Sequence, residues 1–344
     1  AKKGMEALNP QFKDGKTADE SSMPGLDSQQ VREQFLAALD DEGKGENDAE
    51  HAAAGLPFLD LEYEVPFLAH ATLEPMNCTA YVRDDFCEVW APTQNQEMSM
   101  DAVKDITDLD EDQIRIHTTL LGGGFGRRLE TDYVKQAVTV SKLLEKPVQL
   151  TWMREEDIQH DFYRPASISR FQISLGRDGF PLKWENQLAA PSILKRYFSP
   201  LGWFGFDPTS TEGADVLPYA IPDFDFDYSL VDPGVPVGFW RSVGSSHNAF
   251  YTESAIDEAA HTAKQDPFEY RRKLLAQKPR FRKVLEKVAA DANWGRRIPE
   301  GHGLGIALHK SFASIVGAVL EVSANASGNL KMHKVWITID CGKV

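Results

Sequence analysis

The spacing of apolar residues predicts alternating strands and helices after residue 55 and little structure before it. Residues 1–55 are polar and contain one predicted helix, in which Val31, Phe35 and Leu39 share a face behind an Asp27 or Ser28 cap. From Leu56 on, LPFLDLEYEV, CEVWAP and QIRIHTTLL have the β-branched and aromatic content of strands. Because the first 55 residues offer no core of their own, we expect a linker there or the trailing edge of an upstream domain.

A helical period follows between residues 131 and 145. Its apolar face consists of Val134, Ala137, Val138, Ser141 and Leu144. Pro147 ends the helix, and PVQLTWM reads as the next strand. The order strand, glycine turn, helix, strand predicts a βαβ unit.

Two hairpins and a helical region are predicted in the second half. One hairpin turns at 176–179, which contains Asp-Gly, and the other spans 318–341. Residues 191–240 are rich in Pro, Gly and aromatics and are expected to form long ordered loops. Residues 252–292 are predicted helical, with Asp266 as a cap and Glu269 completing a capping box. A helix after Pro279 has one apolar face: Phe281, Val284, Leu285, Val288, Ala289 and Ala292.

Composition narrows the classes of protein that fit. The 344 residues suggest two or three domains, and a formal charge of −15 makes nucleic acid an unexpected partner. No apolar run reaches the roughly 18 residues of a membrane span, and the first residues lack the apolar core of a signal peptide. Three cysteines are too few for a four-cysteine metal site and are interpreted as free thiols. The chain stops within strand-like sequence, which favours a fragment.

The sharpest motif is LLGGGFGRR at 120–128, between a strand and a helix. Gly123, Gly124 and Gly126 allow a tight turn whose backbone N–H groups approach a ligand. Arg127 and Arg128 could clamp a phosphate group. The spacing matches neither GxGxxG nor a P-loop. Two interpretations stay open, an anionic cofactor site or a structural turn with solvent-facing arginines.

Three weaker motifs accompany it. GFWRSVGSSH contains Arg241 among aromatics and could hold a planar or anionic ligand, or it could pack beneath the following helix. WAPTQ places Gln94 at a strand end, as a hydrogen-bond donor or a strand cap. In HATLEPMNC, His70 and Glu74 would suit a metal only on a helix, which Pro75 disfavours, so a hydrogen-bonded turn is expected. No HExxH motif and no GxSxG elbow occur.

Taken together, HATLEPMNCTA, WAPTQ, LLGGGFGRR, REEDIQHDFYRP and RSVGSSHNAFYTESAIDEAA occur in an order that resembles one known family. The chain resembles the molybdopterin-binding large subunit of the xanthine dehydrogenase/aldehyde oxidase family. It is most similar to the branch of isoquinoline 1-oxidoreductase beta subunits and membrane-bound aldehyde dehydrogenase subunits. The resemblance runs from about Pro57 to the C-terminus.

The resemblance implies roles for individual residues. Gln94 matches the glutamine that hydrogen-bonds a molybdenum oxo group, and Gly124, Phe125 and Gly126 match the turn against the cofactor. Gly123 and Arg127 flank that turn and are included as cofactor-binding. Arg241 matches the arginine of a second cofactor loop, and Val243 falls near the substrate wall. Arg127 and Ser242 stand where the wider family has glycine, which leaves the substrate pocket open.

The resemblance also implies a cofactor, a reaction and partners. The full-length protein is expected to bind molybdenum through molybdopterin cytosine dinucleotide, with no protein ligand to the metal, and this fragment need not carry it. The implied reaction is hydroxylation of an aldehyde or an N-heterocyclic aromatic with oxygen from water. Electrons leave through a small 2Fe-2S subunit, with a cytochrome c subunit as a further candidate partner. The family's catalytic glutamate lies beyond the chain end, so no catalytic residue is assigned, and Glu130 is left out.

The expected fold class is α+β, with mixed sheets, flanking helices and an incomplete two-lobed molybdopterin-binding domain. Residues 56–250 are predicted to form most of the first lobe. Residues 251–344 supply closing helices and the start of the second. The branch suggests a periplasmic or membrane-associated location, with the cytoplasm as the alternative. The competing function, from another class, is a non-catalytic binding or assembly module that keeps the fold.

Overall fold

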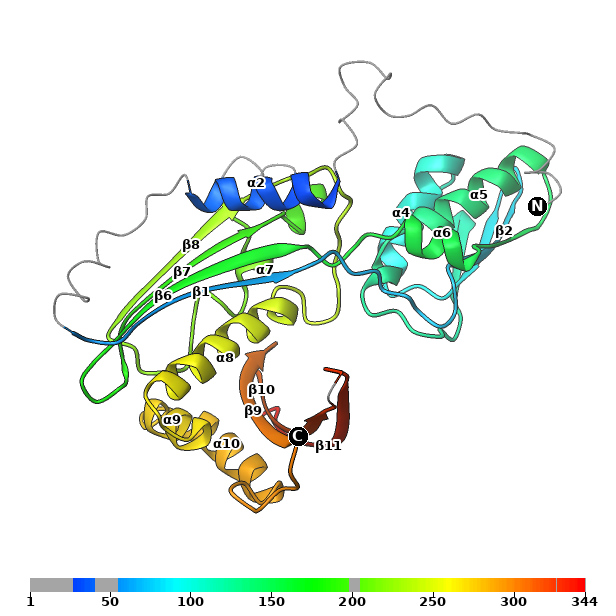
Figure 1. Ribbon diagram of the computed structural model, residues 1–344. Helices are drawn as coiled ribbons and strands as arrows, with labels where there is room; N and C mark the ends of the chain where they lie inside the picture. The colour runs from blue at the N-terminus through cyan, green and yellow to red at the C-terminus, as the bar shows by residue number, and fades with distance from the viewer. Residues whose placement is uncertain (1–26, 41–54, 198–204, 326, 344) are drawn as a thin grey trace.

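The computed structural model describes residues 27–40, 55–197, 205–325 and 327–343. Three sheets and their helices make up this part of the chain (Figure 1). The predicted α+β class with mixed sheets is confirmed, since each of two sheets combines parallel and antiparallel pairs. Within the described residues no helix is long and apolar enough to span a membrane.

The first sheet, called the long sheet here, lies between helices on its two faces. Its strands in spatial order are β1 (Phe58–Val65), β6 (Ser167–Leu175), β7 (Pro181–Ala190) and β8 (Asp223–Leu230). The turn between β6 and β7 is the predicted hairpin, and it ends at Gly179 with a φ of 81°. Helix α2 (Ser28–Asp40) covers one face and α8 (Ser245–Thr262) the other (Figure 1).

The second sheet, called the small sheet, forms a separate unit. Its strands in spatial order are β4 (Ile114–Thr118), β3 (Cys87–Ala91), β2 (Asn77–Val82) and β5 (Val148–Thr151). Helices α4 (Gln96–Thr107) and α5 (Asp132–Leu144) pack with it. β4, α5 and β5 form the predicted crossover, although β3 and β2 lie between the two strands. Leu144 was expected on the buried face but is 57% exposed, as the last residue of the helix.

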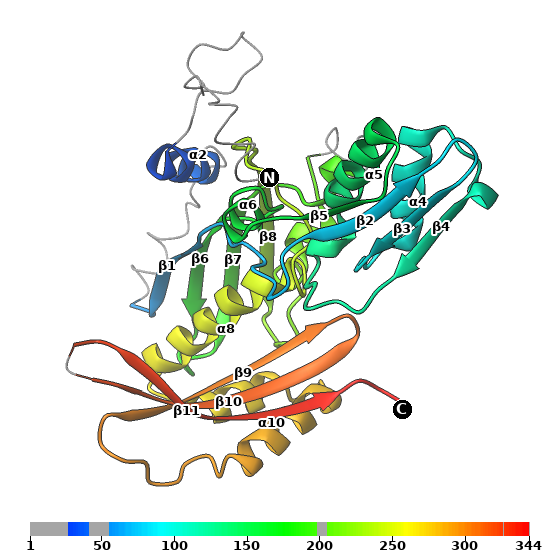
Figure 2. The ribbon, with the colours of Figure 1, turned by 90° about the vertical axis from the view of Figure 1, so that its right-hand side faces the viewer.

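The third sheet, called the C-terminal sheet, packs on a helix layer (Figure 2). Its strands in spatial order are β11 (Leu330–Asp340), β10 (Ser314–Ala324) and β9 (His302–Ser311). Helices α9 (Pro267–Leu274) and α10 (Pro279–Asp291) precede it, and α10 buries the predicted apolar face. Asp266 caps α9 as predicted, whereas Glu269 forms an ion pair with Arg272.

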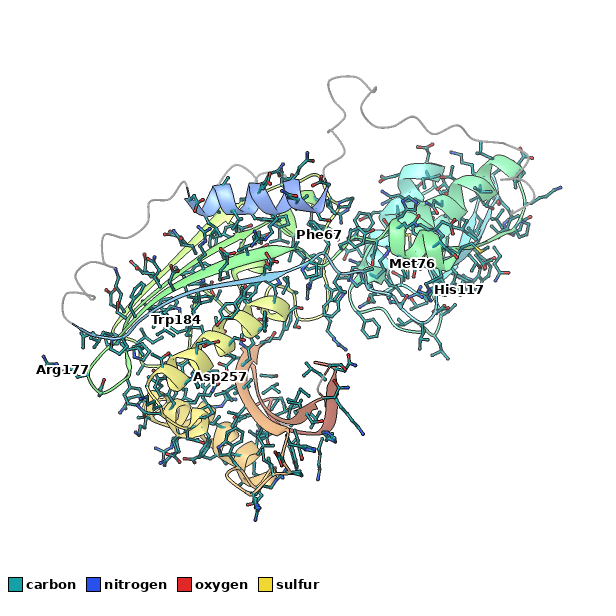
Figure 3. The ribbon with its side chains drawn as sticks, viewed as in Figure 1. Phe67, Met76, His117, Arg177, Trp184 and Asp257 are labelled. Atoms are coloured by element: carbon teal, nitrogen blue, oxygen red, sulfur yellow. The ribbon has the colours of Figure 1, made fainter. Side chains whose placement is uncertain are left out.

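One apolar core joins the long sheet, α8 to α10 and the C-terminal sheet, and it includes Trp184, Tyr251, Leu285 and Val319. The small sheet has its own core around Met76, which Figure 3 shows well apart from Trp184. The boundary between the two lobes was expected at residue 250. This apolar core contains residues from both sides of that position, so the packing shows no division there. The expected boundary stays a prediction.

The helix predicted within residues 1–55 is α2, and its Phe35 and Leu39 are buried against the long sheet, while the assignment of 1–55 to a linker or to the trailing edge of an upstream domain stays a prediction. The expectation for residues 191–240 was wrong in part. The expected loops at 191–240 contain β8, which pairs in parallel with β7. β8 was not recognised from the sequence because every second residue at its start is an aspartate, a residue type that is rare in strands. In the structure Asp223, Asp225 and Asp227 point to solvent at the sheet edge. The predicted loop at 43–51 lies outside the described residues.

Short elements complete the part of the chain that the structure describes. They are α6 (Arg154–Gln159), α7 (Pro208–Thr211) and the 3-10 turns η2 (Glu111–Gln113), η3 (Arg127–Leu129) and η4 (Leu194–Arg196).

Candidate functional site

The glycine-rich motif forms a strained turn between β4 and α5. Phe125 has a φ of 56° and Gly126 a φ of 106°, both in the left-handed region. A Cβ on Gly126 would lie 1.8 Å from the carbonyl oxygen of Phe239, and one on Gly124 would lie 2.3 Å from Gln94 Oε1. The glycines therefore let the turn pack against two other segments.

The second motif forms a loop directly before α8. Ser242 and Val243 are consecutive non-glycine residues with φ values of 67° and 53°. The Val243 N–H donates to the Trp240 carbonyl at 2.7 Å, which closes the turn. Two adjacent left-handed residues cost about 1–3 kcal/mol each, and such strain clusters at ligand sites. α8 begins here at Ser245, seven residues before the predicted helical region.

The two motifs line one cavity of about 400 Å³. Its wall consists of Gln94, Phe125, Gly126, Leu129, Phe239, Trp240, Arg241, Ser242, Val243 and Phe312. Arg241 is the one charged residue of this set, and its guanidinium lies 5.3 Å from the Phe125 ring centre and 5.7 Å from that of Trp240. The cavity is apolar and aromatic with a cationic edge, which suits a planar anion.

Gln94 presents a hydrogen-bond donor at this cavity. Its Oε1 accepts from the Gly126 N–H at 3.1 Å, and this fixes the orientation of the amide. The Nε2 of Gln94 is bonded to no other described residue. An amide nitrogen anchored in this way can donate to an oxygen of a bound ligand.

The arginines after the turn do not reach the cavity. Arg127 is 1% exposed and bonds Asp132 at 2.9 and 2.7 Å, and its Nε lies 3.0 Å from Asp161. Arg128 is fully buried and donates to the carbonyls of Gly123 and Glu74 and to the Glu74 carboxylate. Neither a phosphate clamp nor solvent-facing arginines describe this arrangement. Arg127 was included as cofactor-binding, and direct contact with a ligand would require breaking its buried ion pairs.

The cavity brings together five residues singled out in the sequence, namely Gln94, Phe125, Gly126, Arg241 and Val243. Gly123 and Gly124 belong to the same turn but lie outside the wall. Phe312 was missed, and no local signal marks it. It occupies the two-residue turn between β9 and β10 with a φ of 47°, a position that usually holds Gly or Asn, and it is 69% exposed.

Other candidate residues have structural roles. The segment 70–78 is the expected hydrogen-bonded turn, where the Glu74 Oε2 accepts from the Gly122 N–H at 2.7 Å. Glu130 accepts from Arg196 and Tyr197 and is 7% exposed. Across the residues that the structure describes, no three His, Cys, Asp or Glu side chains converge as a metal site.

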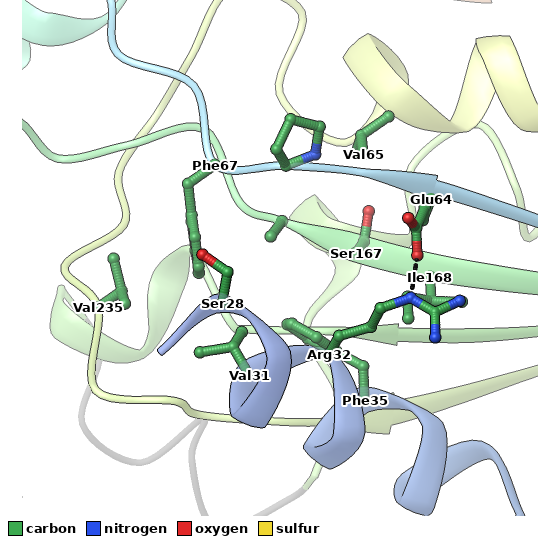
Figure 4. A pocket seen from close by; sticks show the side chains of 12 residues that line it. Ser28, Val31, Arg32, Phe35, Glu64, Val65, Phe67, Ser167, Ile168 and Val235 are labelled. Carbon is green, nitrogen blue, oxygen red and sulfur yellow. Dashed lines mark hydrogen bonds and ion pairs between the residues drawn. The ribbon is translucent and has the colours of Figure 1, made fainter. Parts of the chain in front are cut away.

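A larger cavity of about 610 Å³ lies between α2 and the long sheet (Figure 4). Val31, Phe35, Phe67 and Ile168 line it, and the Arg32–Glu64 ion pair sits at its edge. Most of its lining residues are apolar, and its two charged residues, Arg32 and Glu64, pair with each other. It therefore offers no chemistry comparable with that around Phe125.

The model of the molybdopterin cofactor-binding domain family matches residues 29–275, most of the chain. The chain belongs to this family. Sequence relatives include the isoquinoline 1-oxidoreductase subunit beta of Brevundimonas diminuta, 29% identical over 86% of this chain and 39% of that protein. A second relative is the membrane-bound aldehyde dehydrogenase (pyrroloquinoline-quinone) of Gluconacetobacter polyoxogenes, 28% identical over 83% of this chain and 41% of that protein. The chain thus spans about two fifths of the length of these relatives.

Solved structures of the molybdopterin-binding type share the fold. Quinoline 2-oxidoreductase from Pseudomonas putida 86 matches with a TM-score of 0.62 and 15% identity, covering 84% of this chain and 42% of that one. The aldehyde oxidoreductase of Desulfovibrio gigas matches with a TM-score of 0.56 and 18% identity, covering 84% and 34%. At these identities the likeness shows the fold.

The wall of the cavity fits the cofactor for which the family is named. Trp240 Nε1 is buried and has no hydrogen-bond partner among the described residues, so a donor remains available beside the second loop. Gln94 offers an anchored amide, and Arg241 supplies a positive charge. The cofactor's pterin is planar and its phosphate is anionic, and these three groups are the complementary set.

Proposed function

We propose that the full-length protein is a molybdenum hydroxylase that oxidises an aldehyde or an N-heterocyclic aromatic compound with oxygen from water. One observation carries the proposal: the Phe125 turn and the Arg241 loop, 116 residues apart in the chain, line one cavity with Gln94. When bound, the molybdenum–pterin group supplies the two-electron oxidation. This chain's residues hold and orient it.

Five residues of the wall have defined tasks in this proposal. The Gln94 amide donates to an oxygen of the group, and the Gly126 N–H keeps that amide in place. Arg241 attracts the anionic part. Phe312 and Val243 exclude water from the side where a small aromatic or aldehyde substrate would enter. No residue of this chain is assigned as the catalytic base.

Finer features rest on the sequence resemblance. We propose the cytosine dinucleotide form of the cofactor, a small 2Fe-2S subunit as electron acceptor and a cytochrome c subunit as a further partner. The described part of the chain has only Cys78, Cys87 and Cys341, two of them buried in the small sheet, and these are fewer than the four thiolates of a 2Fe-2S cluster, which supports a separate iron–sulfur subunit. We propose a periplasmic or membrane-associated location, which is supported by the word membrane-bound in one relative's name.

Metal and pterin analysis of the full-length protein tests the proposal. We expect about one molybdenum per chain and pterin fluorescence after denaturation. Arg241→Ala should lower the pterin content, whereas Arg177→Ala, an exposed arginine at the β6–β7 turn (Figure 3), should not. A folded protein without molybdenum or pterin would overturn the proposal. Pyrroloquinoline quinone measured in the same extract would point to the cofactor in one relative's name.

The metal and pterin analysis also distinguishes the proposed hydroxylase from the competing function. A non-catalytic binding or assembly module would be folded, would lack both molybdenum and pterin, and would show no oxidation of aldehydes or N-heterocycles.

A further inference from the structure

His70 links the small-sheet unit to the second loop of the cavity. Its side chain is 1% exposed. Its ring Nδ1 lies 3.0 Å from both carboxylate oxygens of Asp161, and its backbone N–H donates to the same carboxylate at 2.6 Å. Its Nε2 lies 3.0 Å from the carbonyl oxygen of Phe239. One imidazole thus connects residues 91 and 169 positions away in the chain.

Both partners of the ring can only accept hydrogen bonds when Asp161 is ionised. A neutral imidazole has one N–H, so its other nitrogen would turn a lone pair toward an oxygen. The contacts are satisfied when the Nε2–H donates to the Phe239 carbonyl and a second proton lies between Nδ1 and the fully buried Asp161 carboxylate.

Charged groups surround the ring. Asp161 also accepts from the Phe162 N–H at 2.7 Å and lies 3.0 Å from Arg127 Nε. Arg127 in turn pairs with Asp132. The close contacts thus join the His70 ring and the Arg127 guanidinium with two carboxylates. Farther out, Asp157 and Glu130 also act on Arg127, and the Trp240 ring lies 6.3 Å from the imidazole.

The carbonyl that His70 holds is also the one on which the glycine turn rests. Gly126 packs so closely on Phe239 that a Cβ there would lie 1.8 Å from its oxygen. The position of this single oxygen therefore sets the spacing between the Phe125 turn and the loop that carries Arg241.

We propose that His70 is a positioning residue. With Asp161 and Arg127 it forms a buried clasp that holds the Phe239 carbonyl and so presents the loop 239–243 to the cofactor. The link to the cofactor rests on the proposed function. The clasp itself does not, because it is a contact within the chain.

The bond from His70 Nε2 to the Phe239 carbonyl is tested on the wild-type full-length protein. Nitrogen-15 NMR of ring-labelled histidine should show a histidine whose Nε2 carries a proton that exchanges slowly with water. His70→Gln should remove that signal, and His160→Gln, which replaces the exposed histidine beside Asp161, should leave it. A His70 Nε2 without a proton would overturn the clasp as drawn, and this arm does not depend on a variant that folds.

The positioning role is tested by hydrogen exchange and pterin content. In His70→Gln and Asp161→Asn we expect backbone amides in 239–244 to exchange about tenfold faster or more, with α10 unchanged. Pterin retained per chain should fall in both variants and stay at the wild-type level in His160→Gln. Unchanged exchange at 239–244 would overturn the proposal. If even the wild type lacks pterin, the proposed function fails, while the NMR and exchange results still decide the clasp.

Discussion

Gly126 is the residue at which the two walls of the cavity touch, and its substitution gives a sharp prediction. Gly126→Ala places a methyl group 1.8 Å from the Phe239 oxygen and forces alanine to a φ of 106°. We expect the free energy of unfolding to fall by about 2 kcal/mol or more, together with loss of bound pterin. Chemical denaturation measures the first quantity. Gly303→Ala is the control, because a Cβ there meets nothing within 4 Å, and equal losses in both variants would contradict the prediction.

His247, at the start of α8, predicts a pH dependence of stability. The side chain is buried, and neither ring nitrogen has a partner among the described residues. Burial, with a smaller effect from Arg164, lowers the pKa of His247 to about 3. In the unfolded chain this imidazole binds a proton as the pH falls below about 6.5, whereas in the folded chain it stays neutral. The free energy of unfolding therefore decreases as the pH falls below that value.

Replacing His247 by leucine should remove this loss. Between pH 7 and pH 5 the variant is expected to lose about 2 kcal/mol less unfolding free energy than the wild type. Urea unfolding at the two pH values measures it. His160→Leu, at an exposed position, should keep the wild-type dependence. Parallel curves for wild type and His247→Leu would show that the buried imidazole does not govern the acid response.

At the residue scale, the sequence predicted which residues line the cavity better than it predicted which residues they bind. Gln94, Phe125 and Arg241 stand in recognisable motifs, and these bring them to one cavity. The burial of Arg127 could not be read locally, because Asp161 lies on a different segment and only folding brings the two together. His70 was correctly expected in a hydrogen-bonded turn, yet its bond to Phe239 spans 169 positions.

At the scale of elements, α9 is attached to α8 by one buried arginine. Arg271 is fully buried and bonds Glu253 at 2.9 Å, and it also pairs with Asp257. Glu253 additionally accepts from Tyr219 and from the Leu308 N–H of β9. The arginine thus neutralises a carboxylate on which a helix, a loop and a strand converge.

Arg271→Met should therefore be strongly destabilising. Removing one partner leaves the buried charge of Glu253 uncompensated, at a cost of about 3–5 kcal/mol. Arg272→Met is the matched control, because Arg272 forms an exposed pair with Glu269, worth about 0–1 kcal/mol. Denaturant midpoints of the two variants provide the comparison, and similar midpoints would refute the role given to Arg271.

Elements with a strong pattern were predictable, and edge elements were not. The apolar period of α10 and the Asp-Gly turn after β6 are local signals, and both appear in the structure. β8 escaped because an edge strand with alternating aspartates reads as a polar loop. α2 was recognised as a helix, but the sheet face that buries Phe35 could not be inferred from its own residues.

At the scale of the whole molecule, two apolar cores share no residue. One belongs to the small sheet with α4 and α5, and the other joins the long sheet, α8 to α10 and the C-terminal sheet. The cavity wall draws Gln94 and Phe125 from the first unit and Phe312 from the second. A site at such a junction depends on how firmly the units are held together, which gives the His70 clasp its importance.

Separate cores predict separate responses to core substitutions. Val138 in α5 and Val288 in α10 are both fully buried, and each belongs to one core. Truncation of either to alanine should cost about 2 kcal/mol within its own unit. In Val138→Ala, amides of β2, β3 and α5 should exchange about tenfold faster or more, while those of α8 and α10 keep their rates, and Val288→Ala should show the reverse. If either variant accelerates exchange equally in both units, the molecule unfolds as one cooperative body. The shape of the cavity would then depend on the stability of the whole molecule, because the two units would not move or unfold independently.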